Sequence, residues 1–434
     1  MCSESQNANL ASKQPQKVFT LPIYDVICLA RRGKSYQEPS SSQVTCLSHP
    51  SIGTNPKRRL IVRPKFAMSA PDLHILFVAV FASILLLSRC DIDRPQHDVA
   101  LFIFGDSLYD AGTNNYINTT ASYRANFPPY GETFFRYPTG RFTNGRLMVD
   151  FIAEYAKLPP IPSYLQQKNG EFVGGANFAS GGAGALPETH QGYVVDLGTQ
   201  LKQFEKLVKD LKRKLGDEKA KRMVSEGVYM VSIGANDYIY PVVNNPALFQ
   251  SISMEDYVGM VVGNISTVLE GIYKVGARKF GFLAVPPVGC LPALRLVTGN
   301  GSCLRPAIKL TKLHNVAFPA TLAKLESQLQ GFKYSLFDVY TSWIERIQYP
   351  SKYGFKEGKS ACCGSGPYGG NNSCGGMRGV KEYSLCPNPK EYVFFDSYHP
   401  TERVHQQFAQ LMWSGRLRTT KPYNLEALFK HGNI

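Results

Sequence analysis

Three short segments of the chain carry residue types that could together support nucleophilic catalysis. Gly105-Asp106-Ser107-Leu108 offers Ser107 as a nucleophile, and Gly234-Ala235-Asn236-Asp237 offers the side-chain amide of Asn236. In Asp396-Ser397-Tyr398-His399, the spacing of three lets the carboxylate reach the imidazole within one turn. A neutral histidine oriented by a carboxylate can take the proton of a serine hydroxyl.

Each segment taken alone has an ordinary structural explanation. The first could cap a helix, and the other two could be simple turns. The first segment also differs from the G-x-S-x-G elbow of other hydrolases, because Tyr109 occupies the position of the second glycine. The argument for chemistry therefore depends on the three segments occurring together in one chain.

The hydropathy pattern predicts the elements that would position these segments. Short apolar runs that read as strands alternate with amphipathic helical stretches. The predicted strands are Val99–Phe104, Val228–Ile233, Phe280–Val285, Tyr334–Val339 and Tyr392–Phe395. The predicted helices are Leu147–Lys157, Asp196–Leu215, Met254–Val275 closed by Gly276, Leu304–Leu329 and Thr401–Trp413.

This alternation predicts an α/β fold with a parallel sheet and helices on both of its faces. Such folds place their sites at the carboxyl ends of strands, where all three segments occur. Pro319 should break or kink the helix that contains it. Residues 351–390 are rich in Gly, Cys and Asn and should be irregular. We expect a single domain over 91–434, with its core at about 99–415.

Taken together, these segments resemble the sequence blocks of the plant GDSL esterase/lipase family, within the SGNH hydrolase superfamily. Further matches are the glycine block Asn177–Gly184, the run Pro138–Arg146 and the stretch around Cys362-Cys363-Gly364. Order and approximate spacing agree from about residue 99 to 415. The resemblance implies a flavodoxin-like, three-layer α/β/α sandwich with a central parallel sheet.

The resemblance also implies a role for each site residue. Ser107 would attack the ester carbonyl, His399 would act as the general base, and Asp396 would orient His399. The oxyanion would be held by the backbone N–H groups of Ser107 and Gly181 and by the amide of Asn236. No metal or organic cofactor is implied.

The expected function is that of a secreted serine ester hydrolase that acts on acyl lipids or other plant esters through an acyl-enzyme. One alternative is an acyltransferase that uses the same triad. Another is an extracellular binding or defence protein with weak catalysis. The expected partner is therefore a small-molecule or lipid ester, and the oligomeric state is open.

The N-terminal region reads as a targeting sequence. The chain of 434 residues has a formal charge of +15, of which residues 1–67 hold +7. This charge first suggests nucleic acid, but the remainder has no zinc-finger spacing and no basic region with heptads. The thirteen uncharged residues Ile75–Leu87 are too few to span a bilayer and fit the core of a signal peptide.

We therefore expect residues 1–67 to be an upstream extension that the mature protein lacks, and residues 68–90, which start at Met68, to be a signal peptide. The expected location is extracellular or in the cell wall. A plastid or vacuolar location is the alternative, because the leader is also rich in Arg and Ser and poor in acidic residues.

Cysteine usage and glycosylation acceptors agree with secretion. An even set of six cysteines follows the proposed cleavage site, as a disulfide framework requires, although the sequence does not choose among the fifteen possible pairings. Adjacent cysteines should bond to different partners, and the spacing does not fit zinc ligands. The six are Cys290, Cys303, Cys362, Cys363, Cys374 and Cys386, and the glycosylation candidates are Asn118, Asn264, Asn300 and Asn371.

Overall fold

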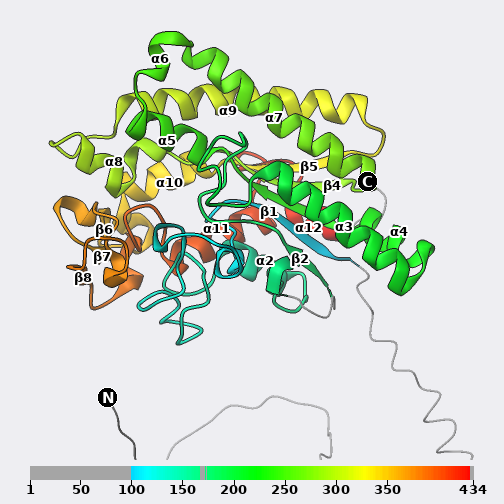
Figure 1. Ribbon diagram of the computed structural model, residues 1–434, viewed down its shortest axis with the longest axis horizontal. Helices are drawn as coiled ribbons and strands as arrows, with labels where there is room; N and C mark the ends of the chain where they lie inside the picture. The colour runs from blue at the N-terminus through cyan, green and yellow to red at the C-terminus, as the bar shows by residue number, and fades with distance from the viewer. Residues whose placement is uncertain (1–98, 167–171, 173, 431–434) are drawn as a thin grey trace, which may run out of the picture. The chain divides into compact units, whose positions relative to one another are not determined.

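A six-stranded sheet forms the centre of the protein in a computed structural model that describes residues 99–166, 172 and 174–430 (Figure 1). The predicted extension and signal peptide lie outside these residues. The strands are β1 (Leu101–Gly105), β2 (Gly175–Asn177), β3 (Val228–Ser232), β4 (Lys279–Leu283), β5 (Lys333–Phe337), β6 (Glu357–Ala361), β7 (Cys363–Gly364), β8 (Ser384–Leu385), β9 (Tyr392–Phe394) and β10 (Thr420–Pro422). The helices are α2 (Met148–Tyr155), α3 (Leu197–Leu215), α4 (Asp217–Glu226), α5 (Ala235–Asn244), α6 (Leu248–Ser251), α7 (Met254–Val275), α8 (Pro292–Val297), α9 (Arg305–Gln328), α10 (Val339–Gln348), α11 (Glu402–Ser414) and α12 (Leu425–Lys430).

The central sheet has the order β10-β5-β4-β3-β1-β2 and is parallel except for β10. β1, β3 and β4 are its middle strands, and their residues are buried, as expected for a parallel sheet covered on both faces. The sequence analysis predicted β1, β3, β4 and β5 but not the two edge strands. β2 contains only three residues, and β10 runs antiparallel on the opposite edge.

Helices cover both faces of this sheet, as predicted. On one face, the in-register residues Phe102, Tyr229 and Phe280 stack across three strands. Phe204 of α3 packs on this aromatic row, α7 lies beside α3, and α9 lies beside α7 (Figure 1). The opposite face contacts α11 and α12 at Gly281 of β4, and α2 packs against α11. The result is the predicted three-layer α/β/α sandwich.

The five predicted helices form close to their predicted bounds. α7 spans Met254–Val275 and ends at Gly276, and Asp196 caps α3 by accepting the Thr199 N–H at 2.9 Å. The sequence analysis expected Pro319 to break or kink its helix; the break does not occur, because α9 continues through this residue. Proline removes one backbone hydrogen bond there, but Phe318 and Leu322 are buried and anchor both halves of the helix in the core.

A second correction concerns the strand before His399. β9 does not join the central sheet but pairs in parallel with β6 in a separate two-stranded sheet. Residues 351–390 are otherwise mostly irregular, as predicted, apart from β6, the short pair β7 and β8 and a few single-turn 3-10 helices.

All six predicted cysteines are paired. The disulfides join Cys290 to Cys303, Cys362 to Cys386 and Cys363 to Cys374, so the adjacent cysteines do bond to different partners. Two of these disulfides lie in a small apolar cluster beside the main core. The cluster consists of Ala125, Tyr130, Phe142, Cys362, Cys363, Cys374 and Phe395.

Candidate active site

Ser107 lies in a tight turn directly after β1. Gly105 ends the strand with a φ of +138°, and a Cβ there would lie 2.0 Å from the Ser232 carbonyl oxygen of β3. Only glycine tolerates this conformation and this close approach. The Asp106 N–H then donates to Ser232 at 3.0 Å, and the Asp106 carboxylate accepts the Leu108 N–H at 3.0 Å. Ser107 is thereby held at the carboxyl edge of the sheet, as predicted.

Gln200 of α3 holds the strand end from behind. This fully buried side chain accepts the Gly105 N–H at 2.8 Å and donates to the Gly105 carbonyl at 2.9 Å. It also donates to the Val195 carbonyl at 2.9 Å. The sequence analysis did not identify this residue, because a glutamine within an amphipathic helix gives no signal of such a contact.

Ser107, His399 and Asp396 meet although 292 and 289 residues separate the serine from the other two in the chain. His399 Nε2 lies 2.8 Å from Ser107 Oγ, and His399 Nδ1 lies 2.8 Å from Asp396 Oδ1. Asp396 is almost completely buried, and His399 has an 11% exposed side chain. The three residues predicted from the resemblance therefore form a continuous hydrogen-bonded series.

The surroundings of Asp396 favour its ionised form. Burial raises the pKa of this carboxyl group. The neighbouring His399, the charge of Arg378 and a hydrogen bond from Tyr130 lower the pKa by more than burial raises it, so it lies well below its usual value. Backbone N–H groups of Tyr398 and His399 also donate to Oδ1, at 2.9 and 2.8 Å. A buried carboxylate with this many donors stays charged and fixed in orientation.

The two adjacent glycines of the glycine block, Gly181 and Gly182, differ in the partners of their amides. The Gly181 N–H donates to Asp110 Oδ2 at 2.8 Å, so this amide is already occupied. The Gly181 carbonyl accepts from Asn114 at 2.8 Å. Because a trans peptide directs its C=O and N–H oppositely, the Gly182 N–H points away from Asn114. Among the described residues, neither this N–H nor that of Ser107 donates to a protein group.

Asn236 and Asp237 connect the start of α5 to the glycine block. The Asn236 amide donates to the Ala183 carbonyl at 2.9 Å, which leaves its second N–H for another acceptor. Asp237 accepts the Ala185 and Leu186 N–H groups at 2.8 and 2.9 Å and the Thr189 hydroxyl at 2.7 Å. This second segment is therefore both part of the site and the anchor of the loop opposite it.

A cavity of about 240 Å³ opens beside these groups. Ser107, Gly181, Gly182, Asn236 and His399 all line it. Its other walls are aromatic or apolar for the most part. They include Tyr123, Phe142, His190, Ile239, Tyr240, Val243, Pro286, Val288, Leu291, Trp343 and Tyr398, together with the polar groups of Asn372 and Arg378.

Three aspartates are buried at the site: Asp106 lines the cavity, while Asp110 and Asp237 accept backbone N–H groups of the glycine block and the loop after it. Burial raises the pKa of Asp106 to about 7 and those of Asp110 and Asp237 to about 6. Backbone N–H donors oppose this increase at each of the three carboxyl groups. Within residues 99–166, 172 and 174–430, no group of three His, Cys, Asp or Glu side chains is arranged to hold a metal ion.

Comparison with known proteins agrees with this architecture. Residues 101–412 match the model of the family described as GDSL-like lipase/acylhydrolase. The chain belongs to this family. It is 48% identical to GDSL esterase/lipase 4 of Arabidopsis thaliana over 84% of this chain and all of that protein. It is 53% identical to GDSL esterase/lipase 1 of Arabidopsis thaliana over 76% of this chain and 90% of that one.

A third relative is a GDSL lipase of Tanacetum cinerariifolium, 50% identical over 77% of this chain and 89% of that one. The resemblance found in the sequence blocks is thus confirmed. The GDSL protein described here is a carboxylic ester hydrolase. No helix in the described part of the chain is long and apolar enough to cross a bilayer.

Proposed function

We propose that this GDSL protein hydrolyses esters as a serine hydrolase with Ser107, His399 and Asp396 as its triad. The observation that carries the proposal is the pair of 2.8 Å contacts that links Ser107 Oγ through the imidazole to Asp396. An imidazole held at both nitrogens in this way is oriented as a general base toward the serine hydroxyl.

The reaction then follows in two stages. Ser107 Oγ attacks the ester carbonyl carbon while His399 Nε2 takes the hydroxyl proton, and a tetrahedral oxyanion forms. The C–O bond to the alcohol breaks as His399 returns this proton to the leaving oxygen, which leaves an acyl-serine. Water, deprotonated by His399, attacks the acyl-serine and releases the carboxylic acid and free Ser107.

Three donors would hold the oxyanion. They are the backbone N–H groups of Ser107 and Gly182 and the free N–H of the Asn236 amide. Gly182 replaces the predicted Gly181, because the Gly181 N–H is already bonded to Asp110. Removal of one such donor typically lowers kcat about 10²–10³-fold.

The apolar and aromatic residues of the cavity walls favour the binding of esters with an apolar or aromatic group on at least one side of the scissile bond. Pro286, Val288 and Leu291 form an apolar wall, while Tyr123 and Tyr240 flank His190 with ring centroids 5.0 and 4.8 Å from its ring. Acyl lipids and other plant esters have such groups. Their transfer from water onto these walls would favour binding.

The test is hydrolysis of a panel of p-nitrophenyl esters and triacylglycerols by wild type and Ser107→Ala, with fluorophosphonate labelling. Wild type should hydrolyse esters and incorporate the label, and Ser107→Ala should do neither. Ser225→Ala, which alters a half-buried serine of α4, is the matched control. Equal activity or labelling in Ser107→Ala and wild type would refute the triad. Addition of alcohols as acceptors measures how much acyl group is transferred instead of hydrolysed.

We also propose that the protein is secreted after cleavage near residue 90. Three disulfides support an oxidising compartment. Asn118 and Asn300 are exposed and suit glycosylation. Asn264 suits it less, because it lies within α7 and donates to the Ala185 carbonyl, and Asn371 donates to Ser365. N-terminal sequencing and glycosidase treatment of the native protein test both points, and a mature chain that starts before Met68 would refute the cleavage.

A further inference from the structure

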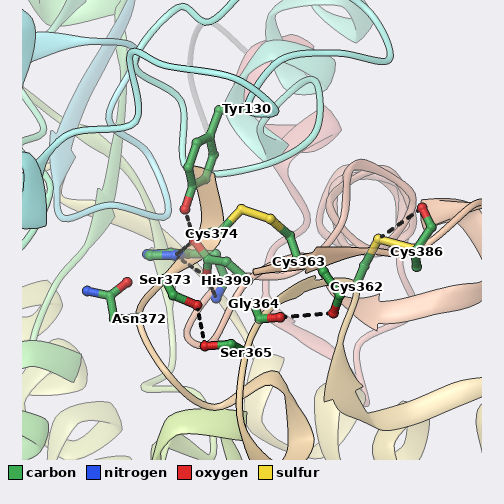
Figure 2. Close-up of a disulfide and its surroundings, with 12 residues drawn as sticks. Tyr130, Cys362, Cys363, Gly364, Ser365, Asn372, Ser373, Cys374, Cys386 and His399 are labelled. Atoms are coloured by element: carbon green, nitrogen blue, oxygen red, sulfur yellow. Dashed lines mark hydrogen bonds and ion pairs between the residues drawn. A yellow bond between two sulfur atoms is a disulfide. The ribbon is translucent and has the colours of Figure 1, made fainter. Parts of the chain in front are cut away.

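The hydrogen-bonded series of the active site continues beyond Asp396 to two residues that the triad mechanism does not use. The Tyr130 hydroxyl donates to Asp396 Oδ2 at 2.6 Å, and Arg378 Nη1 donates to the same hydroxyl at 2.6 Å. Figure 2 shows the Tyr130 ring with its hydroxyl directed toward the group of side chains that includes His399. We propose that Tyr130 and Arg378 are a positioning pair that fixes the catalytic carboxylate of this esterase, an inference that rests on the proposed triad.

The two oxygens of Asp396 have different partners. Oδ1 accepts from His399 Nδ1 and from two backbone N–H groups. Oδ2 has a longer contact of 3.0 Å to His399 Nδ1, so the Tyr130 hydroxyl is its shortest partner. Without this hydroxyl, the carboxylate could rotate and weaken its alignment with the imidazole. Tyr130 on Oδ2 and the two backbone donors on Oδ1 thus together fix the orientation of the carboxylate toward His399.

Arg378 determines which way the phenol donates. A tyrosine hydroxyl has one hydrogen, and its oxygen can accept from a neighbour. Because Arg378 donates to this oxygen, the single hydrogen is left for Asp396. Burial raises the pKa of Tyr130 well above its ordinary value, so the phenol keeps this hydrogen.

The guanidinium of Arg378 is itself held in one place. Its Nε donates to the Ala121 carbonyl at 3.1 Å and its Nη2 to the Arg124 carbonyl at 2.6 Å. It also lies over the rings of Phe127 and Tyr130, at 5.1 and 5.0 Å from their centroids. In the part of the chain that the structure describes, no carboxylate forms an ion pair with it. Its charge is one of the causes that lower the pKa of Asp396, beside the hydrogen bond from Tyr130.

The segment that carries Arg378 is attached to the segment that carries Asp396. Arg378 follows Cys374, whose disulfide partner is Cys363 (Figure 2). The Cys363 N–H donates at 2.7 Å to the carbonyl of Phe395, the residue before Asp396. This arrangement explains how a residue in a stretch with little regular structure can keep a fixed distance to the triad.

The pKa values of two neighbours of the Asp396–His399 pair, Tyr398 and His405, are shifted toward their neutral forms. Burial raises the pKa of Tyr398, and it lowers that of His405 to about 3. Tyr130 is neutral as well, so Arg378 supplies the positive charge beside the pair. Its removal should let the pair bind a proton more tightly, which moves the acid limb of kcat/KM to higher pH.

The test compares Tyr130→Phe, Arg378→Met and Arg378→Lys with two matched controls. Tyr229→Phe removes another buried hydroxyl, which donates to the Val224 carbonyl far from the triad along the chain. Arg403→Met removes another guanidinium that donates to backbone carbonyls and lies over a phenylalanine ring. Folding is checked by circular dichroism, and kcat, KM and their pH profiles are measured with a p-nitrophenyl ester.

Tyr130→Phe and Arg378→Met should lower kcat about 10- to 100-fold, as expected for a lost hydrogen bond to a charged group, with little change in KM. Arg378→Met should also shift the acid limb to higher pH. Arg378→Lys retains the charge and should keep the wild-type limb. If Tyr130→Phe fails to fold, the two Arg378 variants, altered at a partly exposed position, decide the question.

A second readout does not depend on ester hydrolysis. The proton between His399 Nδ1 and Asp396 should give a downfield NMR resonance that moves or broadens in Tyr130→Phe and not in Tyr229→Phe. An unchanged resonance, or kinetics equal to those of the controls, would overturn the positioning role. A wild type without ester hydrolysis or fluorophosphonate labelling would instead refute the proposed function, and the resonance would still decide the positioning role.

Discussion

Replacement of Gln200 by leucine tests how much this side chain stabilises the fold and positions the turn that carries Ser107. The wild-type side chain makes three buried hydrogen bonds to Gly105 and Val195. Leucine has a similar size but no hydrogen-bonding group. The substitution therefore leaves the Gly105 N–H and the Val195 carbonyl without these partners, while the Gly105 carbonyl keeps its bond from the Ser180 N–H at 3.0 Å.

The expected loss follows from these two groups. A buried donor or acceptor without a partner costs about 1–3 kcal/mol. Leucine returns about 1–2 kcal/mol of apolar burial. We therefore expect the free energy of unfolding to fall by about 1–4 kcal/mol. Because Ser107 is only two residues from Gly105, its displacement should also slow fluorophosphonate labelling about 10- to 100-fold under conditions where the variant is folded.

The assay is urea unfolding with the disulfides intact, combined with the rate of fluorophosphonate labelling. Gln203→Leu is the matched control, because it places the same substitution on the same helix, at a side chain whose buried Oε1 has no partner. Because the buried Oε1 of Gln203 has no partner to lose, this control should not lower the free energy of unfolding. Equal stability and labelling in the Gln200 and Gln203 variants would refute the role assigned to Gln200.

Three further predictions concern other parts of the fold. Burial lowers the pKa of His314 to about 3 in the folded protein, compared with about 6.5 in the unfolded chain. Below about pH 6.5 the unfolded chain therefore binds more protons at this residue than the folded protein does, and the free energy of unfolding decreases as the pH falls. Urea unfolding should show that His314→Gln avoids about 2.5 kcal/mol of this loss between pH 7 and 4.5, whereas Tyr238→Phe, which keeps the histidine, should follow wild type. Replacement of Cys363 and Cys374 by alanine opens a disulfide with a sequence separation of 11 and should lower the free energy of unfolding by about 3 kcal/mol in the same assay. Asn236→Ala should lower kcat about 10²–10³-fold with little change in KM, measured by ester hydrolysis, and an unchanged kcat would exclude its amide from the oxyanion site.

The sequence predicted the elements whose patterns are local. The apolar run before Gly105 and the helical stripe of Leu197–Leu215 each bury one continuous surface, and the structure contains both as β1 and α3. The same holds for Met254–Val275, where Ser253 caps the start and Gly276 ends the helix. Such signals depend on residues within a few positions of one another, so a single sequence contains them in full.

The sequence could not predict which strands pair. The run before Asp396 reads as a strand like the others, yet β9 pairs with the polar strand β6 and not with the central sheet. β10 has only three residues, one of them Pro422, and is a strand because it pairs with β5 on the sheet edge. Pairing of this kind depends on contacts between distant segments, which a local pattern does not contain.

The difference between Gly181 and Gly182 has the same physical origin. The two residues have the same side chain, and the sequence block gives no reason to prefer either as an oxyanion donor. Their amides differ because Asp110 binds the first, 71 residues away along the chain, and Asn114 binds the intervening carbonyl from 67 residues away. The bond from Asn114 fixes the peptide between the two glycines and directs its N–H, that of Gly182, away from Asn114, while the bond to Asp110 holds the preceding peptide. A sequence motif thus identified the residues that meet at the site, while the direction of each backbone donor depends on buried partners outside the motif.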